Sequence, residues 1–259
     1  MLDYLKKAQL LRSTYYFVRI MDDVLDGDLL MAGDPAIYVF CFLQQAKSGI
    51  LVGRNTAARL GHHVYRRIDR LDSNCELLTG YLNTLTEAML FDRKRSRRGL
   101  LLSSLELRGH QLQTLESAHN AAFYIAGVHT RARDISHLIR AQAILTTLRN
   151  LKADLSRGLV NIPVDVVTLA QSQGAADLSY EELIPTSAVR EWLAGQLAFG
   201  TEYLEAAGRM LTELKDRRVL SLLGPLYRDL QILAERLHRI LGVDVPVLTE
   251  KDWKTPACY

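Results

Sequence analysis

Apolar residues recur every three or four positions along nearly the whole chain, which is the period of an amphipathic α-helix. The clearest case is residues 135–154, where Leu138, Ala141, Leu145, Leu148 and Leu151 return turn after turn. Glycines, prolines and helix-capping residues separate the periodic segments. The pattern predicts helices over residues 2–25, 36–51, 55–72, 74–91, 105–128, 135–154, 187–214 and 219–241.

Segments between these helices break the period. Residues 92–99 (DRKRSRRG) predict a charged loop or a frayed helix end, and residues 157–164 (RGLVNIPV) predict a break. Asn55 is a candidate N-cap, and Ser103 or Ser104 followed by Glu106 indicates the start of the helix over residues 105–128. Residues 179–182 resemble a capping box for a short segment. The chain has no hairpin pattern, internal repeat or glycine-rich nucleotide motif. We therefore expect one all-α domain spanning residues 1–259.

Composition and charge exclude several classes of protein. Hydrophobic residues make up 48% of the chain and charged residues 24%, which excludes wholesale disorder. The net charge of +3 is lower than a nucleic-acid-binding module usually carries. Three cysteines without a CxxC pair favour a reducing compartment. The longest apolar runs, 37–43 and 121–128, are far shorter than the roughly 20 residues of a membrane span. We expect a cytoplasmic protein that contacts a membrane peripherally if its substrate is a lipid.

An acidic stripe ends the first predicted helix. Asp22, Asp23, Asp26 and Asp28 fall within seven residues, and Asp22 and Asp26 share a helical face. These like charges repel one another, and the helix dipole disfavours anions at this end. A hard divalent cation such as Mg²⁺ would compensate both penalties. The alternative is an acidic, solvated helix end.

Two further side chains extend this stripe by one and two turns. Arg19 precedes Asp22 by three residues and Tyr15 precedes it by seven. An arginine beside metal-binding carboxylates is suited to hold a phosphate with two hydrogen bonds. The alternative for Arg19 is an ion pair within the helix.

A second polar stripe lies late in the helix predicted over residues 135–154. Asn150 and Asp154 are again four residues apart, with Thr146 one turn earlier. Cations flank them at Arg149, Lys152 and Arg157. Oxygen ligands with cations at their edges suit a complex of metal and diphosphate.

Together these segments resemble the squalene/phytoene synthase family. Residues 15–26 (YYFVRIMDDVLD) are similar to the family motif Y-A-F-C-R-x-x-D-D-x-x-D, and residues 146–163 to N-I-L-R-D-x-x-x-D-x-x-x-G-R-x-x-x-P. Weaker matches, in the family's order, are residues 88–92, 123–127 and 227–228. The chain departs from the second motif at three places: Thr146 replaces an asparagine, Asn150 replaces an aspartate and Leu159 replaces the arginine.

The resemblance implies a fold and a site. The fold would be a single helical bundle around a central cavity, like the class I terpenoid synthases. The implied Mg²⁺ ligands are Asp22, Asp23, Asp26, Asn150 and Asp154. The implied catalytic residues are Tyr15, Arg19, Asp22 and Asp26, and the implied substrate contacts are Arg19, Arg149, Arg157, Phe17, Phe123 and Tyr227.

The resemblance also implies a reaction. Two allylic prenyl diphosphates, such as farnesyl diphosphate, would be coupled head-to-head with Mg²⁺, and NADPH would enter only if a reductive step follows. Because an amide at Asn150 binds a metal more weakly than a carboxylate does, two alternatives stay open. One is a terpene synthase that acts on a single prenyl diphosphate, and the other is a non-catalytic binding or assembly protein. The prenyl chain length and the oligomeric state are not predicted.

Overall fold

A computed structural model describes residues 2–51, 55–71 and 76–241, and within these ranges the chain is all-helical, with 81% helix and no strand. The predicted all-α class is therefore confirmed. The longer helices are α1 (Leu2–Asp26), α2 (Pro35–Ser48), α3 (Thr56–Leu71), α4 (Glu76–Arg98), α5 (Ser104–Ala126), α6 (Ser136–Ser156), α8 (Ser187–Glu213) and α9 (Arg217–Leu241). Three short elements are η1 (Ala132–Ile135), α7 (Val164–Ala170) and η2 (Gln171–Ala175). None of the described helices is both long and apolar enough to cross a membrane.

The chain divides into two compact units. Unit 1 comprises Met1–Leu100 and Gln113–Arg131, which include α1 to α4 and the second part of α5. Unit 2 comprises Leu101–Leu112 and Ala132–Tyr259, which include the first part of α5 and the elements from η1 to α9.

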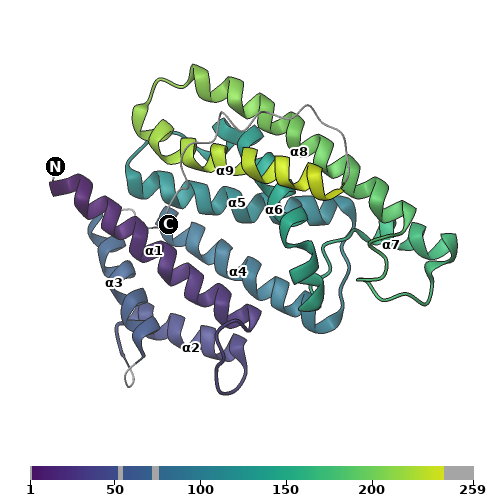
Figure 1. Ribbon diagram of the computed structural model, residues 1–259. Coiled ribbons are helices and arrows are strands. Elements are labelled where there is room, and N and C mark those ends of the chain that lie inside the picture. The colour runs from purple at the N-terminus through teal and green to yellow at the C-terminus, as the bar shows by residue number, and fades with distance from the viewer. Residues whose placement is uncertain (1, 52–54, 72–75, 242–259) are drawn as a thin grey trace. The chain divides into compact units, whose positions relative to one another are not determined.

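In unit 1, α1 packs against α2, α3 and α4 (Figure 1). Phe17 and Met21 of α1 are fully buried and belong to the core of this unit, together with Phe42 of α2. The ring of Phe17 lies edge-to-face with Phe42 and Tyr65, at centroid distances of 5.9 and 6.0 Å. Gly61 lets α3 approach this ring closely, because an added Cβ would collide with it. The apolar period of the first helix thus becomes the packing surface of α1.

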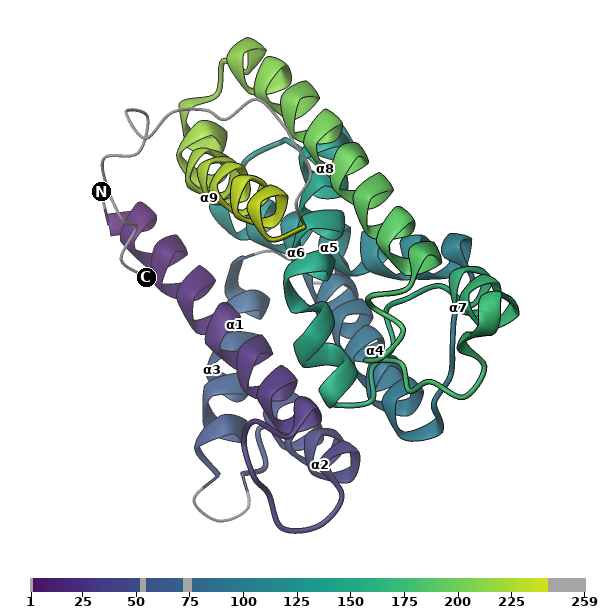
Figure 2. The ribbon, with the colours of Figure 1, turned by 45° about the vertical axis from the view of Figure 1, so that its right-hand side comes forward.

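In unit 2, α6 packs against α8 and α9, and α8 also packs against α7 (Figure 2). Leu138, Leu145 and Leu148 of α6 are buried, as the predicted apolar stripe requires. Gly200 of α8 sits against Leu145, and a Cβ there would lie 3.0 Å from a Leu145 methyl group. The period of 3.6 residues therefore predicts both the helix and its buried face.

Several helix ends follow the expected capping chemistry. Asn55 caps α3, because its Oδ1 accepts a hydrogen bond from the amide of Ala58 at 3.0 Å. Ser103 and Glu106 form a capping box at the start of α5, with the Ser103 amide donating to Glu106 Oε2 at 2.9 Å. Ser179 and Glu182 form the same pair of hydrogen bonds, yet the residues after them are turns rather than a helix.

The charged segment 92–99 is a correction to the sequence-based prediction. It is not a loop, because α4 continues to Arg98 and ends at Gly99, which has a φ of 61°. Arg95 is only 1% exposed and pairs with Asp92 at 2.8 Å, one turn earlier. Arg97 pairs with Asp34, the N-cap of α2, at 2.6 Å. Both ion pairs lie within unit 1. Because they pair arginines of this segment with aspartates, the helix continues through the segment.

Candidate functional site

The acidic cluster, which we define as Asp22, Asp23 and Asp26, lies at the C-terminal end of α1. Gly27 ends the helix with a φ of 84°, and the amide of Leu29 donates to the Asp23 carbonyl at 2.9 Å. The helix has no basic residue in its last turn. The cluster therefore lies at the negative end of the helix dipole, as the sequence predicted.

Arg19 lies between the first two carboxylates of the cluster. Its Nη1 is 2.8 Å from Asp22 Oδ2, and its Nη2 is 2.7 Å from Asp23 Oδ1. Arg19 thus forms the intrahelical ion pairs that were its alternative interpretation. Because half of its side chain is exposed, it is also within reach of an anion that approaches the cluster from solvent.

The electrostatics of the cluster disfavour a full negative charge. The pKa of Asp22 is raised to about 6, first by partial burial and then by the charge of Asp26, while Arg19 opposes this shift. The neighbouring residues Met21, Val24 and Leu25 are buried and apolar, so the carboxylates lie next to the hydrophobic core. A cation bound at the cluster would remove the repulsion that raises this pKa.

The donor set of the cluster fits Mg²⁺. Mg²⁺ is commonly held by one or two carboxylates and completes its coordination with water and phosphate oxygens. Asp22 and Asp26 supply two such carboxylates one turn apart. Among the described residues, no three His, Cys, Asp or Glu side chains converge to hold a metal ion by themselves. The cluster therefore suits a metal that arrives with phosphate ligands better than a closed structural metal site.

The other predicted residues of α1 have different environments. Tyr15 is 63% exposed and contacts the ring of Tyr16 edge-to-face, so it is open to solvent on the Arg19 side of the helix. Phe17 is completely buried in the core of unit 1. Its ring packs against α2 and α3 rather than lining an open pocket.

The second predicted stripe lies on the last two turns of α6, in unit 2. Arg149 Nε donates to Asn150 Oδ1 at 3.0 Å. Asp154 Oδ2 accepts a hydrogen bond at 2.9 Å from the side-chain Nδ2 of Asn161, a buried residue of the segment that follows. Thr146 donates its hydroxyl to the carbonyl of Gln142 at 2.7 Å. Sequence reasoning missed Asn161, because only the folded-back segment brings it to Asp154.

The glycine of the second motif shapes the end of α6. Gly158 has a φ of 77°, its amide donates to the Leu155 carbonyl, and the amide of Leu159 donates to the Asp154 carbonyl. These two bonds form a Schellman motif. Arg157 occupies the C-cap position and is exposed. The chain reversal that follows carries Asn161 back to Asp154.

Phe123 and Tyr227, the remaining predicted substrate contacts, lie in different units. Phe123 of α5 is 1% exposed and its ring contacts that of His119 at a centroid distance of 6.0 Å. Tyr227 of α9 is partly buried against Gly208 of α8, and its hydroxyl accepts a hydrogen bond from Gln231. Burial and the charge of Glu205 raise the pKa of Tyr227.

The predicted site residues are thus brought together only within each unit. The structure joins Arg19 to Asp22 and Asp23 in unit 1, and it joins Arg149 to Asn150 and Asp154 to Asn161 in unit 2. We predict that the two polar stripes share one cavity and one set of metal ions, and this stays a prediction.

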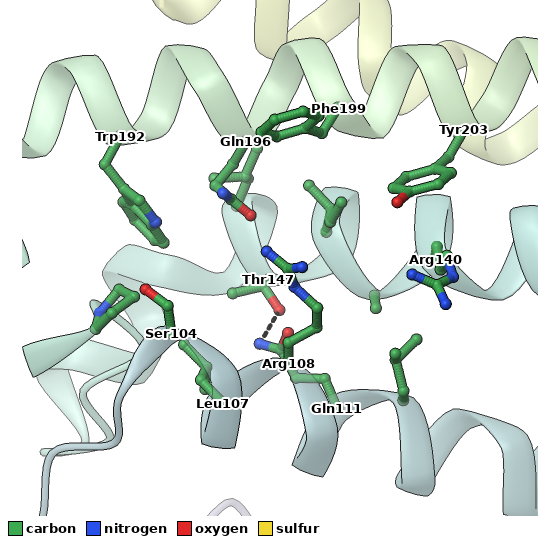
Figure 3. A pocket seen from close by; sticks show the side chains of 15 residues that line it. Ser104, Leu107, Arg108, Gln111, Arg140, Thr147, Trp192, Gln196, Phe199 and Tyr203 are labelled. Carbon is green, nitrogen blue, oxygen red and sulfur yellow. Dashed lines mark hydrogen bonds between the residues drawn. The ribbon is translucent and has the colours of Figure 1, made fainter. Parts of the chain in front are cut away.

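Unit 2 also contains a pocket that sequence reasoning missed. It has a volume of about 150 Å³ and lies among the first turns of α5, the middle of α6 and the first half of α8 (Figure 3). Its walls combine polar and aromatic side chains, including Arg108, Arg140, Trp192, Gln196, Phe199 and Tyr203. None of the site residues predicted from the sequence lines it. The only signal in the sequence is the spacing of residues 192, 196, 199 and 203 on one face of α8.

Comparison of the chain with protein-family models, with curated proteins and with solved structures gives no match.

Proposed function

We propose that this protein is a Mg²⁺-dependent prenyltransferase that couples two allylic prenyl diphosphates head-to-head, with a fold like that of the class I terpenoid synthases. The observation that carries the proposal is the acidic cluster with Arg19 beside it. Three carboxylates lie at the C-terminal end of α1, where the helix dipole disfavours negative charge. The pKa of one of them, Asp22, is raised to about 6. A function that requires a cation at this point accounts for both features.

In this proposal the residues of unit 1 bind the leaving group. Asp22 and Asp26 would hold Mg²⁺, and Asp23 would keep Arg19 in place. Arg19 would contact the diphosphate, since its guanidinium already lies within 3 Å of two of the carboxylates. When bound, Mg²⁺ would neutralise the diphosphate and make it a better leaving group.

The reaction balances without an external oxidant or reductant in its first step. The C–O bond of one substrate breaks, and the electron pair leaves with diphosphate. The double bond of the second substrate then attacks the allylic cation, and loss of a proton closes a cyclopropane ring. Tyr15, exposed two turns before Asp22, is the residue of α1 that we assign to guiding this proton or the released diphosphate.

The test is a product assay with farnesyl diphosphate and Mg²⁺. We expect a product of thirty carbons, detected by mass spectrometry after extraction. Asp22→Asn and Asp26→Asn should each lower turnover by roughly 100-fold or more, because metal-assisted departure contributes several kcal/mol. Asp69→Asn, at an exposed aspartate of α3, should leave turnover unchanged. Normal turnover in Asp22→Asn and Asp26→Asn would refute the proposal.

A second function, diphosphate binding without coupling, is favoured by one observation in unit 2. Arg149 Nε donates to the carbonyl oxygen of Asn150, which is the atom that would otherwise bind a metal. The same assay separates the candidates. Saturable binding of a diphosphate analogue with no change in the substrate identifies a binding protein. A cyclic product of fifteen carbons identifies a terpene synthase that acts on one substrate.

A further inference from the structure

The pocket of unit 2 has the size of a single aromatic ring. Its volume is about 150 Å³, and an engineered protein cavity of about 150 Å³ lined by apolar side chains holds one benzene molecule. A prenyl chain of fifteen carbons with its diphosphate would not fit in this space. The size of the pocket therefore favours a ligand other than the prenyl diphosphate proposed above.

The charge of the pocket is positive. Arg108 of α5 and Arg140 of α6 are among its fifteen lining residues, and none of these residues is an aspartate or glutamate. Arg108 forms no ion pair or hydrogen bond with any other described residue, and its guanidinium extends into the space between Thr147 and Gln196 (Figure 3). A guanidinium presents paired N–H groups that match a carboxylate with two parallel hydrogen bonds.

Arg140 plays a different part from Arg108. Its guanidinium carbon lies 5.6 Å from the ring centroid of Tyr203, within the range of a cation–π contact. This contact holds Arg140 at one end of the pocket and leaves Arg108 as the guanidinium available for a full two-point contact. One available guanidinium favours a ligand with a single negative charge.

Neutral polar groups stand beside Arg108. Gln111 donates its amide to Thr147 Oγ1 at 2.8 Å, so the hydroxyl hydrogen of Thr147 is left to donate to a ligand. Ser104 is engaged elsewhere, because its hydroxyl lies 2.8 Å from Asp165 Oδ2. Because Asp165 would repel an anion near Ser104, Arg108 and Thr147 are the better contacts for an anion.

The remaining wall is aromatic. Trp192 and Tyr203 extend from α8 into the space between the helices, and the ring of Phe199 lies alongside α8 (Figure 3). Phe199 lines the pocket and is 52% exposed, so part of its ring is open to solvent. Aromatic rings stack in offset or edge-to-face geometry, which favours a flat aromatic ligand over an aliphatic one.

We propose that this pocket binds a small aromatic carboxylate of about the size of benzoate, with its carboxylate at Arg108 and Thr147 and its ring against Trp192 and Phe199. The proposal rests on the geometry of unit 2 alone, so it stands or falls independently of the prenyltransferase assignment.

Fluorescence of Trp192 provides the test. The chain has two tryptophans, so Trp253→Phe leaves Trp192 as the only reporter. Titration of this full-length variant with benzoate should give a saturable change in fluorescence, and calorimetry on the unmodified chain should give the same Kd. Arg108→Gln should weaken binding at least about tenfold, because a charge-assisted contact is lost. Arg190→Gln, an exposed arginine of α8 outside the pocket, should bind as the unmodified chain does.

Three ligand controls decide the chemistry. Benzamide, which lacks the charge, and cyclohexanecarboxylate, which lacks the flat ring, should each bind at least about tenfold more weakly than benzoate. Phenyl phosphate should not bind better than benzoate. Absence of saturable benzoate binding, equal affinity in Arg108→Gln with its circular dichroism intact, or tighter binding of any of the three control ligands would overturn the proposal.

Discussion

Asp22 is the side chain in which structure and chemistry are most closely coupled. Its carboxylate is paired with Arg19, yet its pKa is raised to about 6 because partial burial and Asp26 outweigh that pairing. The folded chain therefore binds a proton at this site more tightly than the unfolded chain does. As the pH rises from 4 through 6, the folded state loses stability relative to the unfolded state.

We predict that Asp22→Asn stabilises the chain at pH 7 and leaves its stability unchanged below about pH 4. The gain should be on the order of 1 kcal/mol, because the side chain is 35% exposed and solvent screens its charge. Urea denaturation across this pH range measures the difference. A gain in Asp22→Asn that is the same at pH 4 and pH 7 would contradict the predicted cause.

The environment of Asp22 could be predicted from the sequence more readily than that of Phe17. A helical period places Asp22 and Asp26 on one face, whatever the helix packs against. Whether Phe17 lines a cavity or a core depends on α2 and α3, which supply Phe42 and Tyr65. The resemblance implies a substrate contact at Phe17, and the structure places its ring in the core of unit 1.

Among the helices, the ends follow from local chemistry and the lengths depend partly on tertiary contacts. The N-cap of α3 and the start of α5 could be predicted, because the side chains that cap them bond to backbone groups three residues away. The last turns of α4 could not, because Arg97 is held by Asp34 from the N-terminus of another helix. A segment with five basic residues in eight positions looks solvated until such a partner is known.

We predict that Gly158→Ala destabilises unit 2 by about 1 kcal/mol or more, because an L side chain is strained at the φ of 77° found there. Guanidinium denaturation followed by circular dichroism measures this loss. The matched control is Gly80→Ala on α4, where a Cβ meets no atom within 4 Å and the φ is not positive. That control should be neutral or stabilising by roughly 0.5–1 kcal/mol. Equal effects of the two substitutions would contradict the role given to the Schellman motif.

For the chain as a whole, periodicity predicts which residues are buried but not which helices meet. The pocket of unit 2 is assembled from α5, α6 and α8, whose lining residues are separated by up to about a hundred positions in sequence. Trp192 and Arg108 carry no local signal that they lie together. The helices and the two polar stripes could therefore be predicted from the sequence, whereas the pocket required the packing of unit 2.

We predict that Mg²⁺ and a non-hydrolysable prenyl diphosphate analogue together raise the Tm of the chain, while either alone has a smaller effect. A ligand at about 100 times its Kd adds about 2.7 kcal/mol, which corresponds to a rise of roughly 5–10 °C for a chain of this size. Differential scanning calorimetry measures it. Asp26→Asn should reduce the rise, and a rise that persists undiminished without Mg²⁺ would argue against metal-dependent binding.

The close approach of Gly61 to the ring of Phe17 constrains how this protein can change over generations. Any side chain at position 61 would collide with that ring and with the Cβ of Ala46 on α2. Descendants of the same ancestor should therefore keep glycine at this position for as long as the ring at position 17 and the methyl group at position 46 are both retained.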